Sequence, residues 1–328
     1  MIEMLATPFM QRALLAAVLI GITAPAVGLY LVQRRQAIMG DGIGHVALTG
    51  VSLGFLLDTS PVWMATLVAA AGSLLMELIR ERGRTRGDVA LAMLFYGGMA
   101  GGALIIKLAP NGSMANLTTY LWGSILTVST SDIVAISLLA VFVIAMTVGL
   151  RRQLFAVCQD EEFAKVTGLP VRLLNLLLAV TAAVTVTVAM RVVGLLLVSA
   201  LMVVPVAAAQ QITRSFAATQ ALAVGIGVAV SIAGTGTSYY QDLPPGPTIV
   251  ILAMAVFGLV GLLAVPLARH RHRNTAAPAT HEATAHEATA HEATAHDPAV
   301  RDPAVPAQRT DSTAAAGERP TQRTALAQ

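Results

Sequence analysis

Asp41 and His45, in the segment GDGIGHVALTGVSLGF, have side chains and a spacing suited to a divalent cation. Residues four apart on a helix project from the same face, one turn separated. A carboxylate oxygen and an imidazole nitrogen on one face provide two ligands for a borderline cation such as zinc, manganese or iron. Two ligands neither hold nor select a metal, so others must come from another helix or from a second copy of the chain. Glycines around the pair keep the helix thin and allow neighbouring helices to approach, namely Gly40, Gly42, Gly44, Gly50 and Gly54.

The same two residues also have a purely structural interpretation. In it, Asp41 caps the start of the helix or pairs with Arg34 or Arg35, and His45 is hydrogen-bonded within a bundle. An ionisable group inside a membrane span costs roughly 3 kcal/mol on insertion scales, which favours a functional role for each residue. His45 is also the only histidine before residue 270. The residues alone leave both interpretations open.

Composition places most of the chain in a membrane. Of its 328 residues, 55% are hydrophobic and 12% are charged, and the mean hydropathy is +0.71, which excludes an ordinary soluble protein. Apolar segments of about 20 residues cross a bilayer as helices, because lipid offers backbone groups no other partner. We therefore expect an all-α, polytopic bundle of transmembrane helices. Nine segments qualify, near residues 10–32, 38–57, 61–79, 88–109, 131–150, 172–190, 192–210, 217–236 and 247–268. The two segments around Arg191 have almost no loop between them, and one long bent element there would reduce the count to eight.

Basic residues cluster on one side of the predicted spans. Residues 1–274 carry 17 Lys+Arg against 11 Asp+Glu, and the clusters near Arg34, 80–87 and Arg151 share a side if the chain crosses nine times. The positive-inside rule then puts the N-terminus outside and the C-terminus in the cytoplasm. Topology accounts for these clusters, so the pI near 9.3 does not indicate a nucleic-acid partner. Residues 110–130 are too polar to span the bilayer and predict a re-entrant or interfacial segment.

The other charges in the body have simpler expected roles. Glu77 and Asp88 flank a basic loop and are expected as solvated helix ends, and Asp132 is expected to cap a helix. Asp242 lies in a proline-rich loop before the last span, so it is a weaker candidate for the metal path, at an outer mouth.

Residues 275–328 form a second region, a tail with 4 Lys+Arg against 7 Asp+Glu and an exact HEATA repeat. With no aromatic residue and five prolines, the tail is expected to be disordered, beside a transmembrane domain at 1–274. The repeat offers histidines for weak zinc chelation at the cytoplasmic exit. A repeat expansion without function explains the pattern equally well. The histidines are His281, His286, His291 and His296, with Glu282, Glu287 and Glu292 between them.

The sequence offers no supported motif of a catalytic site. It contains no G-x-x-x-x-G-K-[ST] phosphate loop and no H-E-x-x-H. Its G-x-S-x-G match, GVSLG at 50–54, falls within a predicted membrane helix and not at the strand-to-helix turn on which that motif depends. The single Cys158 allows neither an intrachain disulfide nor a cysteine-based metal site. We therefore expect a non-catalytic membrane protein with no covalently bound cofactor.

The hydrophilic segment CQDEEFAKVTGLP predicts a short helix on the cytoplasmic membrane face. Acidic residues from Asp160 to Glu162 suit the positive N-terminal end of a helix, and Gly168 with Pro170 ends it. Taken by itself, this helix is explained best as a linker.

Several stretches, in the same order, resemble the membrane permease subunits of bacterial ATP-binding-cassette importers for zinc, manganese and iron. The resemblance implies a homodimeric permease in the bacterial plasma membrane, a cytoplasmic ATPase on separate chains and an extracytoplasmic metal-binding protein. It places Asp41 and His45, in a G-D-x-x-x-H-x-A element, on the path of the metal. Its E-x-A-x-x-x-G element, which touches the ATPase, matches Glu162, Ala164 and Gly168, just after Asp160. The matching stretches are RRQAIMGDGIGHVALTGVSLGF, FAVCQDEEFAKVTGLP, RVVGLLLVSALMVVPVAAAQ and SYYQDLPPGPTIV.

The resemblance implies import of a divalent metal ion by alternating access, with motion of the ATPases transmitted through the Asp160–Pro170 helix. The histidine-rich tail modestly favours zinc over manganese. Two alternatives keep a transport function: a permease for a chelate such as a siderophore or cobalamin, and a channel or secondary transporter that needs no ATPase. A third is a membrane-anchored metal buffer that acts through the tail.

Overall fold

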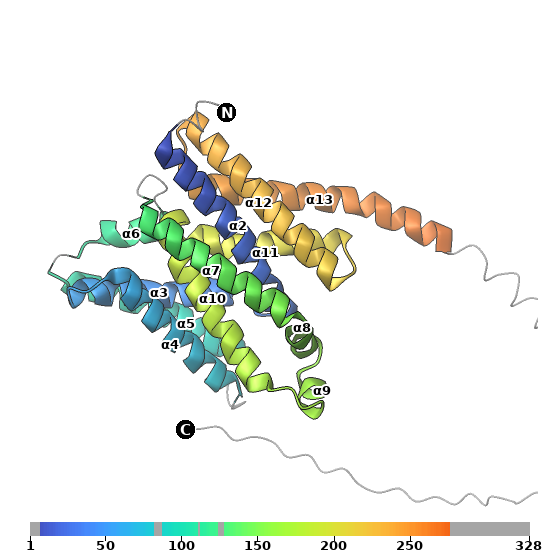
Figure 1. Ribbon diagram of the computed structural model, residues 1–328, viewed down its shortest axis with the longest axis horizontal. Coiled ribbons are helices and arrows are strands. Elements are labelled where there is room, and N and C mark those ends of the chain that lie inside the picture. The colour runs from blue at the N-terminus through green and yellow to red at the C-terminus, as the bar shows by residue number, and fades with distance from the viewer. Residues whose placement is uncertain (1–6, 82–86, 111, 124–127, 276–328) are drawn as a thin grey trace, which may run out of the picture. The chain divides into compact units, whose positions relative to one another are not determined.

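The computed structural model describes residues 7–81, 87–110, 112–123 and 128–275, which form twelve helices and no strand (Figure 1). This confirms the predicted all-α fold. The chain divides into two units, 1–269 and 270–328, and the first holds the bundle. The helices are α2 (Pro8–Gln33), α3 (Met39–Leu56), α4 (Pro61–Glu81), α5 (Gly87–Leu108), α6 (Met114–Trp122), α7 (Thr130–Gly149), α8 (Arg151–Gln159), α9 (Glu161–Val166), α10 (Val171–Val193), α11 (Leu195–Ile212), α12 (Phe216–Gln241) and α13 (Pro245–Thr275).

Eight of these helices are long and apolar enough to cross a membrane, namely α2, α4, α5, α7, α10, α11, α12 and α13. They coincide with eight of the nine predicted segments. The ninth predicted segment is α3, a continuous helix of 18 residues whose apolar sequence contains Asp41, His45 and several glycines. Most of α3 is buried, and it packs against α4, α5, α10 and α11; Figure 1 shows α3, α4 and α5 grouped together. Protein therefore surrounds the polar groups of α3, which lowers the cost of placing them at membrane depth.

The alternative of one bent element around Arg191 is wrong, because α10 and α11 are separate helices. Gly194 ends α10 with a φ of 88°, a left-handed conformation that reverses the chain. At the end of α10, Arg191 reaches Asp132 at the start of α7, with Nη1 2.8 Å from Oδ1. After α11, Phe216 packs on Phe155, just beyond the other end of α7, with ring centroids 5.0 Å apart. The chain therefore crosses the bundle once between these two contacts, along α11, as a helix separate from α10.

The polar stretch at 110–130 contains one short helix, α6. Ser113 caps α6 by accepting a hydrogen bond from the backbone of Asn116 at 3.3 Å. The helix contacts α3, α5, α10 and α11, and its Leu117 is buried. Residues 124–127 lie outside the described part of the chain. A short packed helix agrees with the predicted re-entrant or interfacial segment, whose depth in the membrane stays a prediction.

Several basic residues predicted to share a side of the membrane do meet at one end of the bundle. The ends of α2 and α4 contribute Arg34 and Arg80, and both guanidinium groups lie near Glu161 at the start of α9. Arg172 at the start of α10 pairs with Glu81 at the end of α4, with Nε 3.1 Å from Oε2. This shared end positions α9 directly beside the turn that leads into α3.

Candidate metal site

Asp41 and His45 lie near the start of α3, and their side chains face each other across one turn. Nε2 of His45 is 4.0 Å from Oδ1 of Asp41. The imidazole is 9% exposed and the carboxylate is 31% exposed, so the pair extends from the interior of the bundle towards an accessible surface. At 4.0 Å the two groups do not form a hydrogen bond, and each keeps atoms available to a third partner.

The imidazole of His45 is enclosed by neighbouring helices. Phe95 of α5 packs on it edge to face, with ring centroids 4.4 Å apart and an interplanar angle of 69°. Gly98 brings the α5 backbone against α3, because a Cβ there would lie 2.7 Å from the backbone carbonyl carbon of His45. On α3 itself, a Cβ at Gly44 would overlap the side chain of Leu195 on α11. The close approach predicted at the glycines of α3 is therefore seen at Gly44, whereas the contact at Gly98 was not predicted.

One nitrogen of His45 has no hydrogen-bond partner. Nδ1 is buried and unpartnered within the described part of the chain. Leaving a buried polar atom unsatisfied costs about 1–3 kcal/mol, which additional contact with a cation or a polar group would offset. The structural interpretation of His45 as a hydrogen-bonded residue of the bundle therefore lacks the hydrogen bond it requires at this atom.

The structural interpretation of Asp41 also finds little support. Within the described residues Asp41 makes no ion pair with either arginine of the preceding turn. The guanidinium of Arg34 instead lies 3.7 Å from Glu77 and 3.8 Å from Glu161. Ile38 is the N-cap residue of α3, so Asp41 is not its cap, although a negative charge in the first turn suits the helix dipole.

The metal-ligating groups of one chain do not form a complete site. The described residues contain no group of three or more His, Cys, Asp or Glu side chains able to hold a metal ion. Asp242 is exposed and is the C-cap residue of α12, with a left-handed φ of 52°. Its position at the helix end is a structural role that needs no metal. The four tail histidines lie outside the described residues. Asp41 and His45 are therefore the strongest pair available.

The remaining acidic residues of the long helices have structural partners. Glu77 is 1% exposed, so its predicted role as a solvated helix end is wrong. Arg80 donates to both of its oxygens, from Nε at 3.0 Å and from Nη2 at 2.6 Å. Asp132 forms a capping box with Ser129, which confirms its predicted role. The side chain of Asp88 lies outside the described part.

The predicted docking residues occupy α9 and its ends. Asp160 caps the helix by accepting a hydrogen bond from the backbone of Phe163 at 2.9 Å, and Gly168 ends the segment with a φ of 81°. The side chain of Glu162 is 85% exposed. Ala164 is fully buried against the bundle. The short helix therefore presents Glu162 outward and uses Ala164 as its inward contact.

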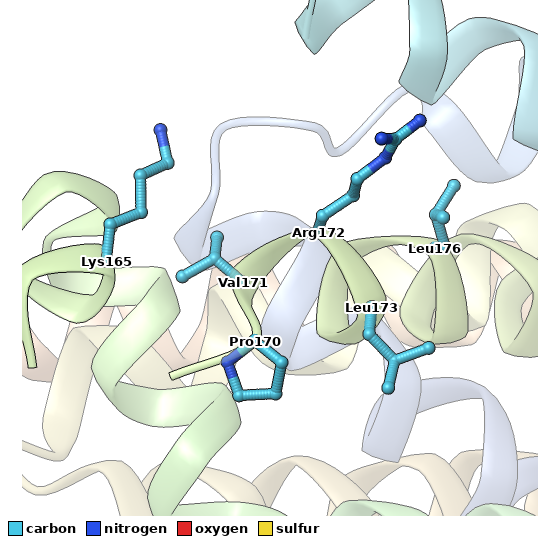
Figure 2. Close-up of a pocket in the computed structure, with 6 residues that line it drawn as sticks. All are labelled: Lys165, Pro170, Val171, Arg172, Leu173 and Leu176. Atoms are coloured by element: carbon cyan, nitrogen blue, oxygen red, sulfur yellow. The ribbon is translucent and has the colours of Figure 1, made fainter. Parts of the chain in front are cut away.

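Sequence reasoning missed two apolar residues on the outer face of α9. Phe163 is 64% exposed and Val166 is 86% exposed. Beside them lies an open hollow of about 470 Å³, where Lys165 and Arg172 stand on either side of Val171 (Figure 2). A hydrogen bond to Glu162 raises the pKa of Lys165 and keeps it charged. Exposed apolar side chains with charges around them are typical of protein interaction sites. The signal in the sequence was the pair of apolar residues within an otherwise hydrophilic segment.

Comparison with known proteins covers the whole bundle. The ABC 3 transport family matches residues 6–264. The manganese transport system membrane protein MntC of Halalkalibacterium halodurans is 30% identical over 257 residues, 78% of this chain and 88% of its own. The chelated iron transport system membrane protein YfeD of Yersinia pestis is 30% identical over 261 residues, 80% of this chain and 87% of its own. The structure of PsaBC from Streptococcus pneumoniae in complex with Fab has a TM-score of 0.71 at 28% identity, covering 79% of this chain and 95% of that one. The chain therefore belongs to the ABC 3 transport family, as a membrane permease of the class that its motifs resemble.

Proposed function

We propose that this chain is the permease subunit of an ATP-binding-cassette importer that moves a divalent transition-metal ion past Asp41 and His45. The observation that carries the proposal is the buried imidazole of His45, whose Nε2 lies 4.0 Å from the Asp41 carboxylate without bonding to it and whose Nδ1 has no partner among the described residues. Relatives named for manganese and chelated-iron transport support a metal as the cargo. A carboxylate and an imidazole suit both zinc and manganese, and the HEATA histidines favour zinc.

Two copies of the permease form the metal path between them. The described part of one chain supplies only two ligands, and a second copy supplies the same two from its own α3. A site of this kind binds an ion briefly, whereas a closed cage of strong ligands would retain it. The incompleteness of the site in one chain supports a homodimer.

Energy for transport comes from an ATPase on separate chains, because this sequence has no phosphate loop. The ATPase docks on the outer face of α9, where Glu162, Phe163 and Val166 are exposed. Ala164 contributes by its small size, which lets α9 lie close to the bundle. ATP-driven motion of the ATPases moves α9 and alternates access to the metal path, into which an extracytoplasmic binding protein delivers the ion.

The end of the bundle that carries α9 faces the cytoplasm. Arg34, Arg80 and Arg172 lie at that end, and cytoplasmic loops are enriched in Lys and Arg. Nine crossings of a bacterial plasma membrane then leave the N-terminus outside and the tail inside.

Uptake into proteoliposomes that contain the permease, its ATPase and its binding protein tests the metal site. Asp41→Ala and His45→Ala should each lower ATP-dependent uptake of radioactive zinc and manganese by at least about tenfold, because each removes a ligand. Asp58→Asn is the matched control, since Asp58 is a carboxylate just beyond the other end of α3 and asparagine tolerates its φ of 50°. Wild-type uptake by both alanine variants, in complexes that hydrolyse ATP, would rule the site out.

Co-purification of the ATPase tests the docking surface. Glu162→Arg reverses the exposed charge of α9 and should abolish stoichiometric binding of the ATPase, while the permease itself stays monodisperse. Val166→Ser removes an exposed apolar contact without changing charge and should weaken binding less. Retained full binding by both variants would refute docking at α9.

The same proteoliposomes separate the alternatives. A chelate permease would transport a siderophore or cobalamin complex and leave free ions outside, whereas a channel or secondary transporter would work without ATP. A metal buffer would depend on the tail, so unchanged uptake after deletion of residues 275–328 would exclude it.

A further inference from the structure

Four charged side chains meet at the end of the bundle beside α9. They come from three segments: Arg34 from the turn between α2 and α3, Glu77 and Arg80 from α4, and Glu161 from α9. This four-charge cluster has two positive and two negative members. Lys165 of α9 lies at its edge, with Nζ 3.6 Å from Glu161, and its nearer partner is Glu162 at 2.9 Å. Arg34 is 6% exposed and Glu77 is 1% exposed, while Arg80 and Glu161 are 24% and 30% exposed. The cluster therefore connects the buried turn before α3 to the docking helix.

The two guanidinium groups share the two carboxylates unequally. Arg80 binds Glu77 through two hydrogen bonds and reaches Glu161 at 3.3 and 3.4 Å. Nη2 of Arg34 lies 3.7 Å from Glu77 and 3.8 Å from Glu161, and it is buried without a hydrogen-bond partner. A shift of about 1 Å by Glu161 would give Arg34 a hydrogen bond of ordinary length. Arg34 is therefore the second arginine partner of Glu161, held just short of bonding.

Exchange of the carboxylate between the two guanidinium groups leaves the cluster electrically balanced. The sum of charges stays zero whichever arginine binds Glu161, so neither arrangement leaves a carboxylate buried without a cation nearby. A buried charge left without an opposite charge would cost several kcal/mol, and both arrangements avoid this cost. Two arrangements of similar energy make the kind of bistable element through which motion passes between sites.

The turn that carries Arg34 is tightly bonded to α3. Arg35 adopts a left-handed φ of 58°, which is unfavourable for a residue with a side chain. The backbone of Gln36 donates to Leu31 at 2.8 Å, and that of Met39 donates to Gln36 at 2.9 Å. No flexible linker therefore separates Arg34 from α3, and displacement of Arg34 is passed to the helix that holds Asp41.

We propose that Glu161 exchanges its arginine partner, from Arg80 to Arg34, when the ATPase moves α9, and that this exchange shifts the start of α3. Arg34 and Arg80 are then positioning residues that couple ATP hydrolysis to the metal pair. This inference rests on the proposed function of α9 and of Asp41 and His45.

The number of metal ions transported per ATP hydrolysed tests this coupling, in proteoliposomes holding the complete transporter. Arg34→Gln removes the second partner, while Arg80 keeps its hydrogen bonds to both carboxylates, so the complex should assemble and hydrolyse ATP. Metal transported per ATP should fall at least about fivefold, the lower end of ordinary coupling energies. Arg34→Lys keeps the charge and should retain more coupling than Arg34→Gln. Arg191→Gln is the matched control, because it breaks an arginine–carboxylate pair at the other end of α10, away from α9, where the arginine is 46% exposed, and its coupling should be unchanged.

A second variant keeps the test decisive if Arg34→Gln does not assemble. Glu161→Gln changes a partly exposed carboxylate of the cluster and should cause a similar loss of metal transported per ATP. The double variant Arg34→Gln, Glu161→Gln should transport as much metal per ATP as either single variant, because both changes remove the same exchange. Wild-type metal per ATP in Arg34→Gln and Glu161→Gln would overturn the inference. Failure of the proposed function has a different signature: the wild-type complex itself would show no ATP-dependent metal uptake.

Discussion

Two sets of charged groups lie on either side of the start of α3, and they are satisfied to different degrees. The four-charge cluster is balanced within one chain, and Arg80 binds Glu77 through two hydrogen bonds. Asp41 and His45, a few residues further on, stand 4.0 Å apart with an unpartnered nitrogen. Every member of the cluster has an opposite charge within 4 Å, although Nη2 of Arg34 makes no hydrogen bond to a described residue, whereas Asp41 and His45 have only each other among the described residues and leave room for a further partner.

This contrast follows from the cost of burying charge. A buried ion pair contributes little net stability, but loss of one member leaves the other unpaired at a cost of several kcal/mol. The Asp41 carboxylate is 31% exposed and bears no such penalty. Loss of the most buried member of the cluster, Glu77, should therefore damage the fold, and disruption of the metal pair should damage only transport.

Glu77→Gln should have the largest effect on stability. It leaves two guanidinium groups with one carboxylate, and Glu77 is 1% exposed, so the free energy of unfolding should fall by about 3–5 kcal/mol. Unfolding of the purified permease in detergent measures this. Glu81→Gln, which breaks a pair with an exposed arginine, should cost less than about 1 kcal/mol. Equal losses in the two variants would contradict the structural role of the cluster.

Substitution of Gly98 by alanine should have the next largest effect. The added Cβ would lie 2.7 Å from the backbone of His45, so α5 must move away from α3, at a cost of about 1–3 kcal/mol. Gly97→Ala on the same helix meets no atom within 4 Å and should leave stability unchanged or slightly higher. Thermal unfolding of the two variants side by side decides whether the enclosure of His45 depends on this contact.

Asp41→Ala should change stability by less than about 1 kcal/mol, even though it abolishes transport, because its contact with His45 is long and partly exposed. The same unfolding assay measures this. A loss as large as that of Glu77→Gln would assign Asp41 to the framework of the bundle and remove the contrast between the two sets.

The smallest expected effect concerns the thiol of Cys158, which lies near Arg34. Burial raises the pKa of Cys158 to about 11, and the opposing charge of Arg34 is the weaker influence. At pH 8 only about a thousandth of the thiol is ionised, so alkylation should be slow and should accelerate as the pH approaches 11. Val166→Cys, exposed on α9, should react far faster in the same chain. Fast alkylation of Cys158 at pH 8 would show that this region is open.

The sequence predicted the helices well and the four-charge cluster not at all. Apolar length is a local property, so α2, α4 to α5, α7 and α10 to α13 are visible in it. The shared face of Asp41 and His45 follows from helix periodicity. Glu77 resembles any acidic residue beside a basic loop, and its burial depends on Arg34 and Glu161, which are distant in sequence. The break between the segments 172–190 and 192–210 was predicted, but the alternative of one bent element stayed open, because a left-handed turn at Gly194 between two apolar runs leaves no loop to recognise.

Permease dimers with one altered copy test the central claim most directly. Two differently tagged copies, one wild type and one carrying Asp41→Ala and His45→Ala, can be purified as mixed dimers and reconstituted with the ATPase and binding protein. If both copies contribute ligands to one path, uptake of zinc and manganese should fall at least about tenfold relative to the wild-type dimer, as it does when both copies are altered. Retention of half the wild-type uptake would show that each copy transports independently and would contradict the shared metal site.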